Sequence, residues 1–470
     1  MPNDSRRPEG GTPRAGEGDV NSSPRRRAWR AGNVDPEADA LLARDAAVFL
    51  HQSVSTPCLA VVRKAEGIWI EDNRGRRYMD FHGNNVHHIG YGHPRLKEAI
   101  RRQLDELPFA PRRFTCDAAV ELAEKLVALA PGDIGKVLFA TGGSDAVEIA
   151  LAYARAYTGR FKTISFWDAF HGAGFGARSV GGEEMFRSGP IGPLLAGTEH
   201  VPPFGDYRNA WGVREGSADL CASTIRYVLE KEGDVAAVIA EPMRAVPYVA
   251  PPGFWRRVRE ACDATGTLLI FDEIPTGLGK TGRMFACEHE DVTPDILVLG
   301  KSLGGGVVPL AAMLCRPELD VAGRYAFGHY THEKNPVTTR AGLTTLQIIE
   351  DEGLVENAAR IGERALARLH DLMDRHPLIG DVRGRGCVFG AELVLDRDSR
   401  VPAGDAADSV LYRALDRGLS FKTTMGNVLT FTPPLILTPE QLDRALDIVD
   451  ACIGEVEREL GIGTRGTSAT

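Results

Sequence analysis

The sequence lacks long apolar runs and closely spaced cysteines. Its longest interior apolar stretch is about the length of Val235–Ala240, far short of the roughly 20 residues that a membrane-spanning helix needs. The 8 cysteines are far apart, form no C-x-x-C pair and follow no apolar secretory segment, so we expect reduced thiols and a cytoplasmic protein. The histidine group His82, His87, His88 and His93 has no cysteines spaced beside it, and we expect no metal site.

An excess of basic residues is also absent. The chain carries 55 Lys and Arg against 64 Asp and Glu, a formal net charge of −9, which argues against nucleic acid or an anionic membrane as a partner. Any anion that binds must therefore be held by local groups. With 43% hydrophobic and 25% charged residues, the composition is that of an ordinary globular protein, and it excludes a fully disordered or collagen-like chain.

The length of 470 residues predicts more than one domain. Residues 1–33 are rich in Arg, Gly, Pro and Ser without apolar periodicity, and we expect them to be a disordered tail. Residues 34–90 predict a helix and a hairpin that join the smaller domain and a dimer contact. Residues 91–353 predict a large ligand-binding domain, and residues 354–462 a smaller α+β domain.

Strands and helices alternate through the large domain, which predicts an α/β fold with a mostly parallel sheet covered by helices on both faces. The expected strands are Val137–Ala140, Thr163–Phe166, Val235–Ala240, Thr267–Phe271 and Ile296–Leu299. The smaller domain is expected to contain a helix over 354–372, strands within 382–394, a helix over 406–417, a strand at 428–431 and a helix from 439.

Three of the expected strands end in polar groups, at the edge where ligands of open α/β sheets bind. Gly142, Gly143 and Ser144 open a helix whose N–H groups can hold a phosphate, although the same pattern also begins ordinary helices. Asp272 ends a buried strand, and Lys301 follows another. A lysine there is unusual unless it is paired or forms a Schiff base with an aldehyde. Pyridoxal phosphate offers a partner to all three groups.

The segment Leu268–Leu310 is similar to the signature of class III pyridoxal-phosphate aminotransferases. Lys301 stands 29 residues after Asp272, the separation usual in that family. The resemblance spans about residues 45–460 and implies the fold type I transferase architecture, in a homodimer with active sites at the subunit interface. It implies that Lys301 is the residue that forms the imine with the cofactor, and that Asp272 faces the pyridine nitrogen.

The resemblance also implies further cofactor contacts. Phe170 matches the residue that stacks on the cofactor ring, and Thr331 matches a threonine that reaches the cofactor phosphate from the neighbouring subunit. Without the resemblance, a lone Phe or Thr is more often a packing or capping residue. The full set of implied cofactor-binding residues is Gly142, Gly143, Ser144, Phe170, His171, Glu241, Asp272, Lys301 and Thr331.

The chain departs from the family at its carboxylate-binding switch. Thr430 stands where many members have an arginine that binds a substrate carboxylate, and Val246 replaces the glutamate that pairs with that arginine. Either charge alone would be left unpaired in a closed site, which is costly. The absence of both the arginine and the glutamate is therefore physically consistent. A second carboxylate substrate is therefore not obviously accommodated. Pro275 also replaces the glutamine that contacts the ring hydroxyl.

Other polar residues are expected on the substrate side. Several converging donors suit a phosphonate or phosphate, which accepts more hydrogen bonds than one carboxylate. The stretches Asp80–Gly92 and Tyr330–Lys334 resemble class III ammonia-lyases that act on 1-hydroxy-2-aminoethylphosphonate. The predicted substrate-binding residues are Arg244, His82, Asn84, Asn85, His87, Arg113 and Thr430.

These features favour an ammonia-lyase that acts by β-elimination on a small primary amine carrying a phosphonate or phosphate. Lys301 would remove a proton from the carbon that bears nitrogen, while Asp272 keeps the cofactor ring protonated. Transamination to a keto acid is the alternative within the family. A non-catalytic binding protein is a third reading, which the presence of both Asp272 and Lys301 disfavours. Glu273 is expected to be a structural partner of a nearby donor.

Overall fold

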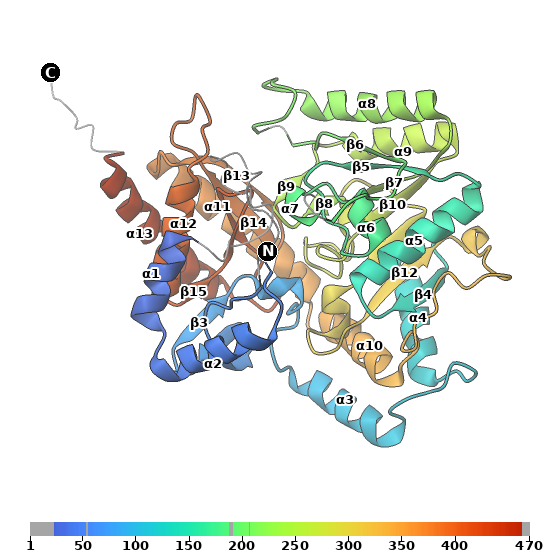
Figure 1. The fold of residues 1–470 in the computed structure, drawn as a ribbon, viewed down its shortest axis with the longest axis horizontal. Helices are drawn as coiled ribbons and strands as arrows, with labels where there is room; N and C mark the ends of the chain where they lie inside the picture. Colours follow the sequence, from blue (N-terminus) through green and yellow to red (C-terminus); the bar gives the residue numbers. More distant parts are fainter. Residues whose placement is uncertain (1–22, 53–54, 188–190, 206, 463–470) are drawn as a thin grey trace, which may run out of the picture.

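The chain folds into two units, a large one and a smaller one that combines both ends of the chain. The computed structural model describes residues 23–52, 55–187, 191–205 and 207–462. Figure 1 shows the large unit in teal, green and yellow around one sheet, and the smaller unit with its N-terminal blue elements beside its orange and red C-terminal ones. The N-terminal segment thus joins the smaller unit, not the large sheet.

The large unit is built on a seven-stranded sheet in which all strands except β12 run parallel. This confirms the predicted α/β class, although β6 and β12 are additional to the expected strands. The strands, in spatial order, are β4 (Lys136–Ala140), β12 (Ala311–Cys315), β11 (Ile296–Leu299), β10 (Leu268–Asp272), β7 (Val235–Ala240), β5 (Lys162–Phe166) and β6 (Thr198–Val201). Because the other six share one direction, their carboxyl ends meet at one edge.

Helices cover both faces of this sheet. The central strands are apolar throughout because alternate residues face two different cores: Leu269 packs into one hydrophobic cluster and Ile270 into the other. Helix α5 packs on β12, β11 and β7, and α9 packs on α8 and β10 (Figure 1). The helices of this unit are α3 (Pro94–Glu106), α4 (Asp117–Leu129), α5 (Gly143–Thr158), α6 (Phe175–Val180), α7 (Glu184–Arg187), α8 (Ser217–Glu232), α9 (Phe254–Thr265) and α10 (Pro336–Asp351).

The smaller unit contains two four-stranded sheets. In one, the predicted hairpin of β2 (Trp69–Asp72) and β3 (Arg77–Asp80) lies between β1 (Val62–Glu66) and β15 (Leu419–Ser420), so a C-terminal strand pairs with an N-terminal one. The other sheet is β13 (Ile379–Arg385), β14 (Val388–Leu393), β17 (Val428–Phe431) and β16 (Lys422–Thr424). Its helices are α11 (Leu354–Arg375), α12 (Gly404–Asp416) and α13 (Pro439–Leu460).

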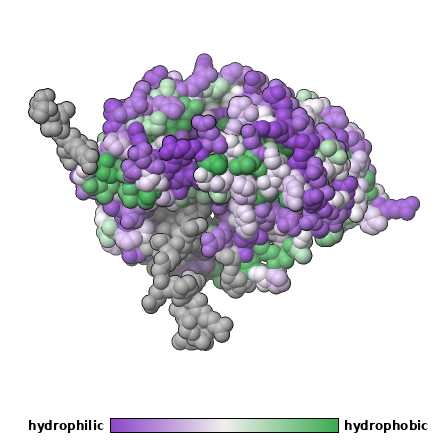
Figure 2. Space-filling view, turned by 90° about the horizontal axis from the view of Figure 1, so that it is seen from above, coloured by the Kyte–Doolittle hydropathy of each residue, from purple (hydrophilic) through white to green (hydrophobic). Residues whose placement is uncertain are grey.

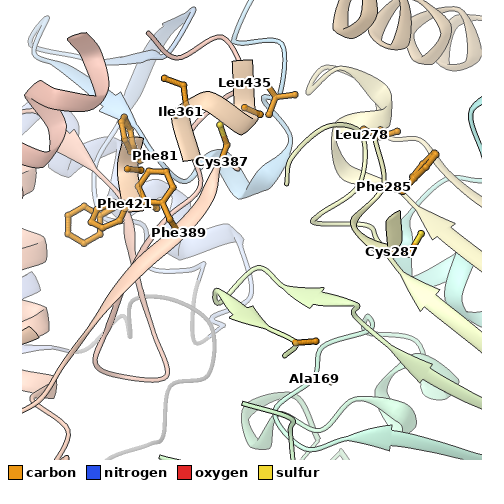
Figure 3. Packing of buried hydrophobic residues seen from close by; sticks show 14 of the residues in the cluster. Phe81, Ala169, Leu278, Phe285, Cys287, Ile361, Cys387, Phe389, Phe421 and Leu435 are labelled. Carbon is orange, nitrogen blue, oxygen red and sulfur yellow. The ribbon is translucent and has the colours of Figure 1, made fainter. Parts of the chain in front are cut away.

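A cluster of aromatic side chains joins the N-terminal segment to the C-terminal sheet. The ring of Phe431, at the end of β17, lies 6.4 Å from Phe81, 5.7 Å from Phe389 and 4.8 Å from Phe421 between centroids. Figure 3 shows Phe81, Phe389 and Phe421 packed beside one another. Since Phe81 directly follows β3, this cluster fixes where the next residues, from His82 onward, lie.

The predicted tail is wrong for its last ten residues, which form helix α1 (Pro24–Asn33, 10 residues). Ser23 caps this helix by accepting the N–H of Arg26, and Trp29, only 5% exposed, packs into the main core. A single large apolar side chain gives no periodic pattern, so the sequence did not predict this helix. Helix α2 (Pro36–Val48) follows, close to the expected helix. Residues 1–22 lie outside the described part of the chain.

The face in Figure 2 is largely hydrophilic, with small separate hydrophobic patches. Across the described residues, no helix combines the length and apolar character needed to cross a membrane.

Candidate active site

Three predicted site residues lie at the carboxyl ends of three adjacent strands. Asp272 ends β10, Glu241 directly follows β7, and Lys301 comes two residues after β11. Strand β10 lies between β7 and β11, and Asp272 is level with Val298 of β11. The fold therefore brings these three residues to one edge of the sheet, where the sequence led us to expect Asp272 and Lys301.

Asp272 is buried and held from two sides. Its Oδ2 lies 2.8 Å from Nδ1 of His171, and its Oδ1 accepts the N–H of Ile274 at 3.1 Å. Asp272 is 2% exposed. The other ring nitrogen of His171, Nε2, is buried and has no hydrogen-bond partner among the described residues. A carboxylate fixed in this way is suited to face a basic nitrogen and keep it protonated.

Lys301 has a strained backbone. Its φ is +47°, in the left-handed region that non-glycine residues seldom occupy, at the start of the short 3-10 helix Lys301–Gly304. Such strain costs on the order of 1–3 kcal/mol and is concentrated at functional sites. The conformation thus fixes the direction in which this lysine leaves the sheet edge.

The start of α5 has the features of an anion cradle. The N-cap residue of α5 is Gly142, which has no side chain. No N-cap side-chain oxygen therefore accepts the first N–H groups of the helix. A Cβ on Gly172, whose φ is +127°, would collide with Ser144, and the neighbouring Ala173 N–H donates to Ser144 Oγ at 2.9 Å. Unsatisfied N–H groups and close backbone approach suit a phosphate, so the cradle fits the cofactor phosphate.

The backbone of Phe170 contacts a buried ionic cluster of Glu183, Glu241 and Arg244. The N–H of Phe170 donates to Glu241 Oε1 at 3.3 Å, and Arg244 places Nε 3.5 Å from that oxygen and Nη2 3.4 Å from Oε1 of Glu183. Burial alone would lower the pKa of Arg244, but the two carboxylates leave it raised. Arg244 also lies 5.5 Å from the ring centre of Tyr248, and its Nη1 has no hydrogen-bond partner within the described residues.

The segment after β3 carries four of the predicted substrate residues. Asp80 Oδ1 accepts the N–H groups of His82 and Gly83, which starts the 3-10 turn Gly83–Asn85, where Asn84 and Asn85 have φ of 46° and 59°. His82 is half-buried, Asn84 is exposed and Asn85 is buried.

His87, the fourth of these residues, is buried. Its Nε2 lies 3.0 Å from the Asp80 carbonyl oxygen. Burial lowers the pKa of His87 to about 4, so its ring is neutral near pH 7. The predicted contact of His87 with the substrate would therefore be made by an uncharged imidazole.

The remaining predicted residues lie in different environments. Thr430 is buried in β17 with its hydroxyl 2.7 Å from that of Thr424. Thr331 and Arg113 are exposed, next to a contact in which Arg112 donates to the Tyr330 carbonyl at 2.9 Å. The exposure of Thr331 is compatible with a contact to another subunit, and its role stays a prediction.

Two further charged residues close to the site emerge from the fold. Glu273 accepts the N–H groups of Ala286 and Cys287, the latter at 2.8 Å, which confirms the structural role expected for it. Burial raises its pKa to about 7. Sequence reasoning missed Lys280, which is fully buried. The available signal was a lysine within the glycine-rich run that follows β10.

In the described ranges, no three His, Cys, Asp or Glu side chains group as metal ligands would.

Comparison with known proteins identifies the family. The family model for aminotransferase class III matches residues 51–453. The chain belongs to this family. Its cofactor is therefore pyridoxal phosphate. Three features of the described residues fit that molecule: the buried Nε2 of His171, which has no hydrogen-bond partner there, the Asp272 carboxylate fixed by His171, and the cradle at Ser144.

Individual relatives cover almost the whole chain. The chain is 44% identical over 456 residues to the (R)-1-hydroxy-2-aminoethylphosphonate ammonia-lyase of Vibrio splendidus, across 94% of this chain and 95% of that protein. It is 35% identical over 412 residues to the isoleucine 2-epimerase of Lentilactobacillus buchneri, across 84% and 90%. The omega transaminase of Pseudomonas jessenii in complex with PMP superposes with a TM-score of 0.85 at 29% identity, across 90% and 99%. The predicted fold type and family are confirmed.

Proposed function

We propose that this enzyme is an ammonia-lyase for a small primary amine that carries a phosphonate, such as 1-hydroxy-2-aminoethylphosphonate. The observation that carries the proposal is the 44% identity, over 94% of the chain, to a lyase with that substrate. Thr430 and Val246 support it, because both are uncharged and buried where a carboxylate-binding pair would be needed for a keto acid.

The cofactor, when bound, supplies an electron sink for the carbon that bears the substrate nitrogen. Lys301 takes the proton from this carbon, and the hydroxyl group of the neighbouring carbon leaves as water. The enamine that is released then takes up water and breaks down to the aldehyde and ammonia. Asp272, oriented by His171, holds the proton on the ring nitrogen. The net reaction converts the amino alcohol into 2-oxoethylphosphonate and ammonia, with no net oxidation and no second substrate.

The other predicted residues take binding roles in this proposal. The first turn of α5, with Gly142, Gly143 and Ser144, holds the cofactor phosphate, and Phe170 stacks on the ring. Arg244 lies beside Glu241 at the sheet edge. It receives the phosphonate together with donors of the entrance residues, which are His82, Asn84, Asn85, His87 and Arg113.

A homodimer completes the site. Thr331 is exposed together with the apolar side chains of Phe109 and Phe114, and Phe109 packs on His332 at 5.5 Å between ring centres. Apolar side chains beside a predicted cofactor residue are typical of a subunit interface. In the dimer, Thr331 reaches the cofactor phosphate of the partner subunit. We expect the enzyme to be cytoplasmic.

Transamination is the second candidate, favoured by the structural similarity to an omega transaminase. One assay separates the two. The purified holoenzyme is incubated with 1-hydroxy-2-aminoethylphosphonate and without any keto acid. Ammonia release over many turnovers supports the lyase. A single turnover that resumes only after addition of pyruvate or 2-oxoglutarate overturns it. Lys301→Ala serves as the inactive control.

A further inference from the structure

Lys280 is a fully buried amine whose partners belong to the other unit. Its Nζ donates to the carbonyl oxygens of Thr432 at 3.0 Å and Pro433 at 2.7 Å, and the residue is 0% exposed. Lys280 belongs to the loop that follows β10 and Asp272, while Thr432 and Pro433 follow β17. One ammonium group therefore joins the cofactor side of the large unit to the end of a strand in the smaller unit.

Stability alone does not explain this lysine. Among the described residues, no carboxylate lies within ion-pair distance of its Nζ, and a buried ammonium without such a partner is costly. The titratable groups that face it are Asp80, Cys387, His87 and His88. Burial lowers the pKa of Lys280 to about 8. An apolar side chain of similar length would fill the same space without the desolvation penalty.

The two carbonyl groups belong to a segment that also supports the substrate entrance. Thr432 donates its N–H to the Phe81 carbonyl at 2.7 Å and its hydroxyl to the His82 carbonyl at 3.2 Å. Further along, Leu435 donates its N–H to the His88 carbonyl at 2.8 Å. Cys387, which directly precedes β14, donates its N–H to the Lys280 carbonyl at 2.8 Å.

We infer that Lys280 is a positioning residue for the substrate side of the site. By holding Thr432 and Pro433, it fixes the end of β17, and through Thr432 it fixes His82 and the residues that follow, relative to Asp272. The inference rests on the proposed function in one respect, namely that the segment from His82 to His87 contacts the substrate. It adds a residue that touches neither substrate nor cofactor.

The test compares Lys280→Met and Lys280→Arg as holoenzymes. In Lys280→Met, which removes the donors but keeps the length, we expect KM to rise by about tenfold or more while kcat changes by less than about threefold. The visible absorbance of the cofactor stays unchanged. Lys280→Arg restores KM to near the wild-type value, because its guanidinium can donate to both carbonyls.

A pH profile gives a second readout. In the wild type, KM rises above pH 8 as Lys280 loses its proton. In Lys280→Arg this alkaline rise is absent, since arginine stays charged. A Lys280→Arg profile that keeps the wild-type rise overturns the inference.

Arg160→Met is the matched control. Arg160 also donates to backbone carbonyls, those of Val235, Thr265 and Gly266 at 3.2, 2.9 and 3.2 Å, but at the opposite end of β7. We expect it to lower Tm without raising KM. If Lys280→Met behaves in the same way, or loses kcat and cofactor, Lys280 is only a structural link and the inference fails.

A binding measurement separates this inference from the proposed function. The probe is 2-aminoethylphosphonate, which lacks the leaving hydroxyl group, titrated by the change in cofactor absorbance. Weaker binding to Lys280→Met than to Arg160→Met supports the positioning role, and equal binding overturns it. The proposed function fails separately, if the wild type releases no ammonia from the hydroxylated amine.

Discussion

Nδ1 of His171 lies 2.8 Å from Oδ2 of Asp272, and both side chains are closed off from solvent. This pair connects the loop after β5 to the end of β10, residues that are 101 positions apart in the chain. The imidazole fixes the orientation of the carboxylate, which would face the ring nitrogen of the cofactor. We therefore expect His171 to act on the cofactor through Asp272 rather than alone.

Replacing His171 by Phe tests this relationship. The variant keeps an aromatic ring but, among the described residues, leaves Asp272 with only the N–H of Ile274 as a donor. We expect weaker cofactor retention and a kcat lower by roughly 10- to 100-fold, as is typical when the group that orients a functional residue is lost. His200→Phe is the control, because His200 bonds the Gly181 carbonyl at 2.9 Å and does not touch Asp272. Equal effects of the two variants would show that His171 only fills space.

The backbone conformation of Lys301 leads to a prediction about the relative stability of glycine and alanine at this position. Because its φ is +47°, alanine is strained at this position and glycine is not. We expect cofactor-free Lys301→Gly to be more stable than Lys301→Ala by about 1 kcal/mol, measured as a higher Tm. Both variants lose the covalent cofactor band and activity. A higher Tm for the alanine variant would contradict the conformation.

We expect Arg244 to recognise the charge of the substrate without taking part in the chemical step. Lys keeps the positive charge that offsets Glu183 and Glu241 but loses the planar pair of donors that suits a phosphonate. We expect Arg244→Lys to raise KM for the phosphonate amine by about tenfold or more, with little change for an uncharged primary amine.

Arg383→Lys is the control for Arg244. Arg383 lies 5.0 Å from the ring centre of Tyr248, the same ring that Arg244 contacts, but it forms its ion pairs with Asp381 and Glu392 of the smaller unit. The ratio of the two amine activities should stay at the wild-type value. A loss of both activities in Arg244→Lys would assign this arginine to structure alone.

Much of the fold could be predicted from sequence because the central strands are short and consist of apolar residues up to the site edge. Val235–Ala240 and Leu268–Asp272 have every residue buried, and the polar residues after them marked the site edge. The strand Ala311–Cys315 was missed. It runs antiparallel between two parallel neighbours, an arrangement that an alternation of strands and helices does not predict.

The buried charge pairs could not be predicted in the same way. Arg244 and Glu183 are 61 residues apart, and neither carries a local pattern that names the other. Among the described residues, Lys280 bonds only to backbone carbonyls. Every residue type has a backbone carbonyl, so the sequence does not indicate which ones accept these bonds. Such partners depend on how distant segments pack, within the large unit for Arg244 and between the two units for Lys280. Asp272 and Lys301 were predictable because each stands at the end of a recognisable strand.

His376 gives the smaller unit a stability that depends on pH. Its Nδ1 and Nε2 each lie 2.7 Å from a carboxylate of α13, Glu457 and Asp450 respectively. Burial alone would lower the pKa of His376, but these hydrogen bonds raise it above 6.5. The folded state thus binds this proton more tightly than the unfolded chain, so the stabilisation is full below the unfolded pKa and is lost as pH rises through the folded one.

His376→Gln therefore should lower Tm most at acidic pH, and the difference from wild type should shrink between pH 6 and pH 9. Glutamine is uncharged and can donate to only one of the two carboxylates, so it lacks the charge-assisted pair of bonds, which contributes on the order of 1–3 kcal/mol. Arg375→Gln removes a neighbour of the same carboxylate, Asp450, but arginine does not titrate in this range. Its effect on Tm should be constant across the range. A His376→Gln difference that is equally constant would mean that His376 is neutral in the folded protein, and that the two carboxylates do not hold its proton.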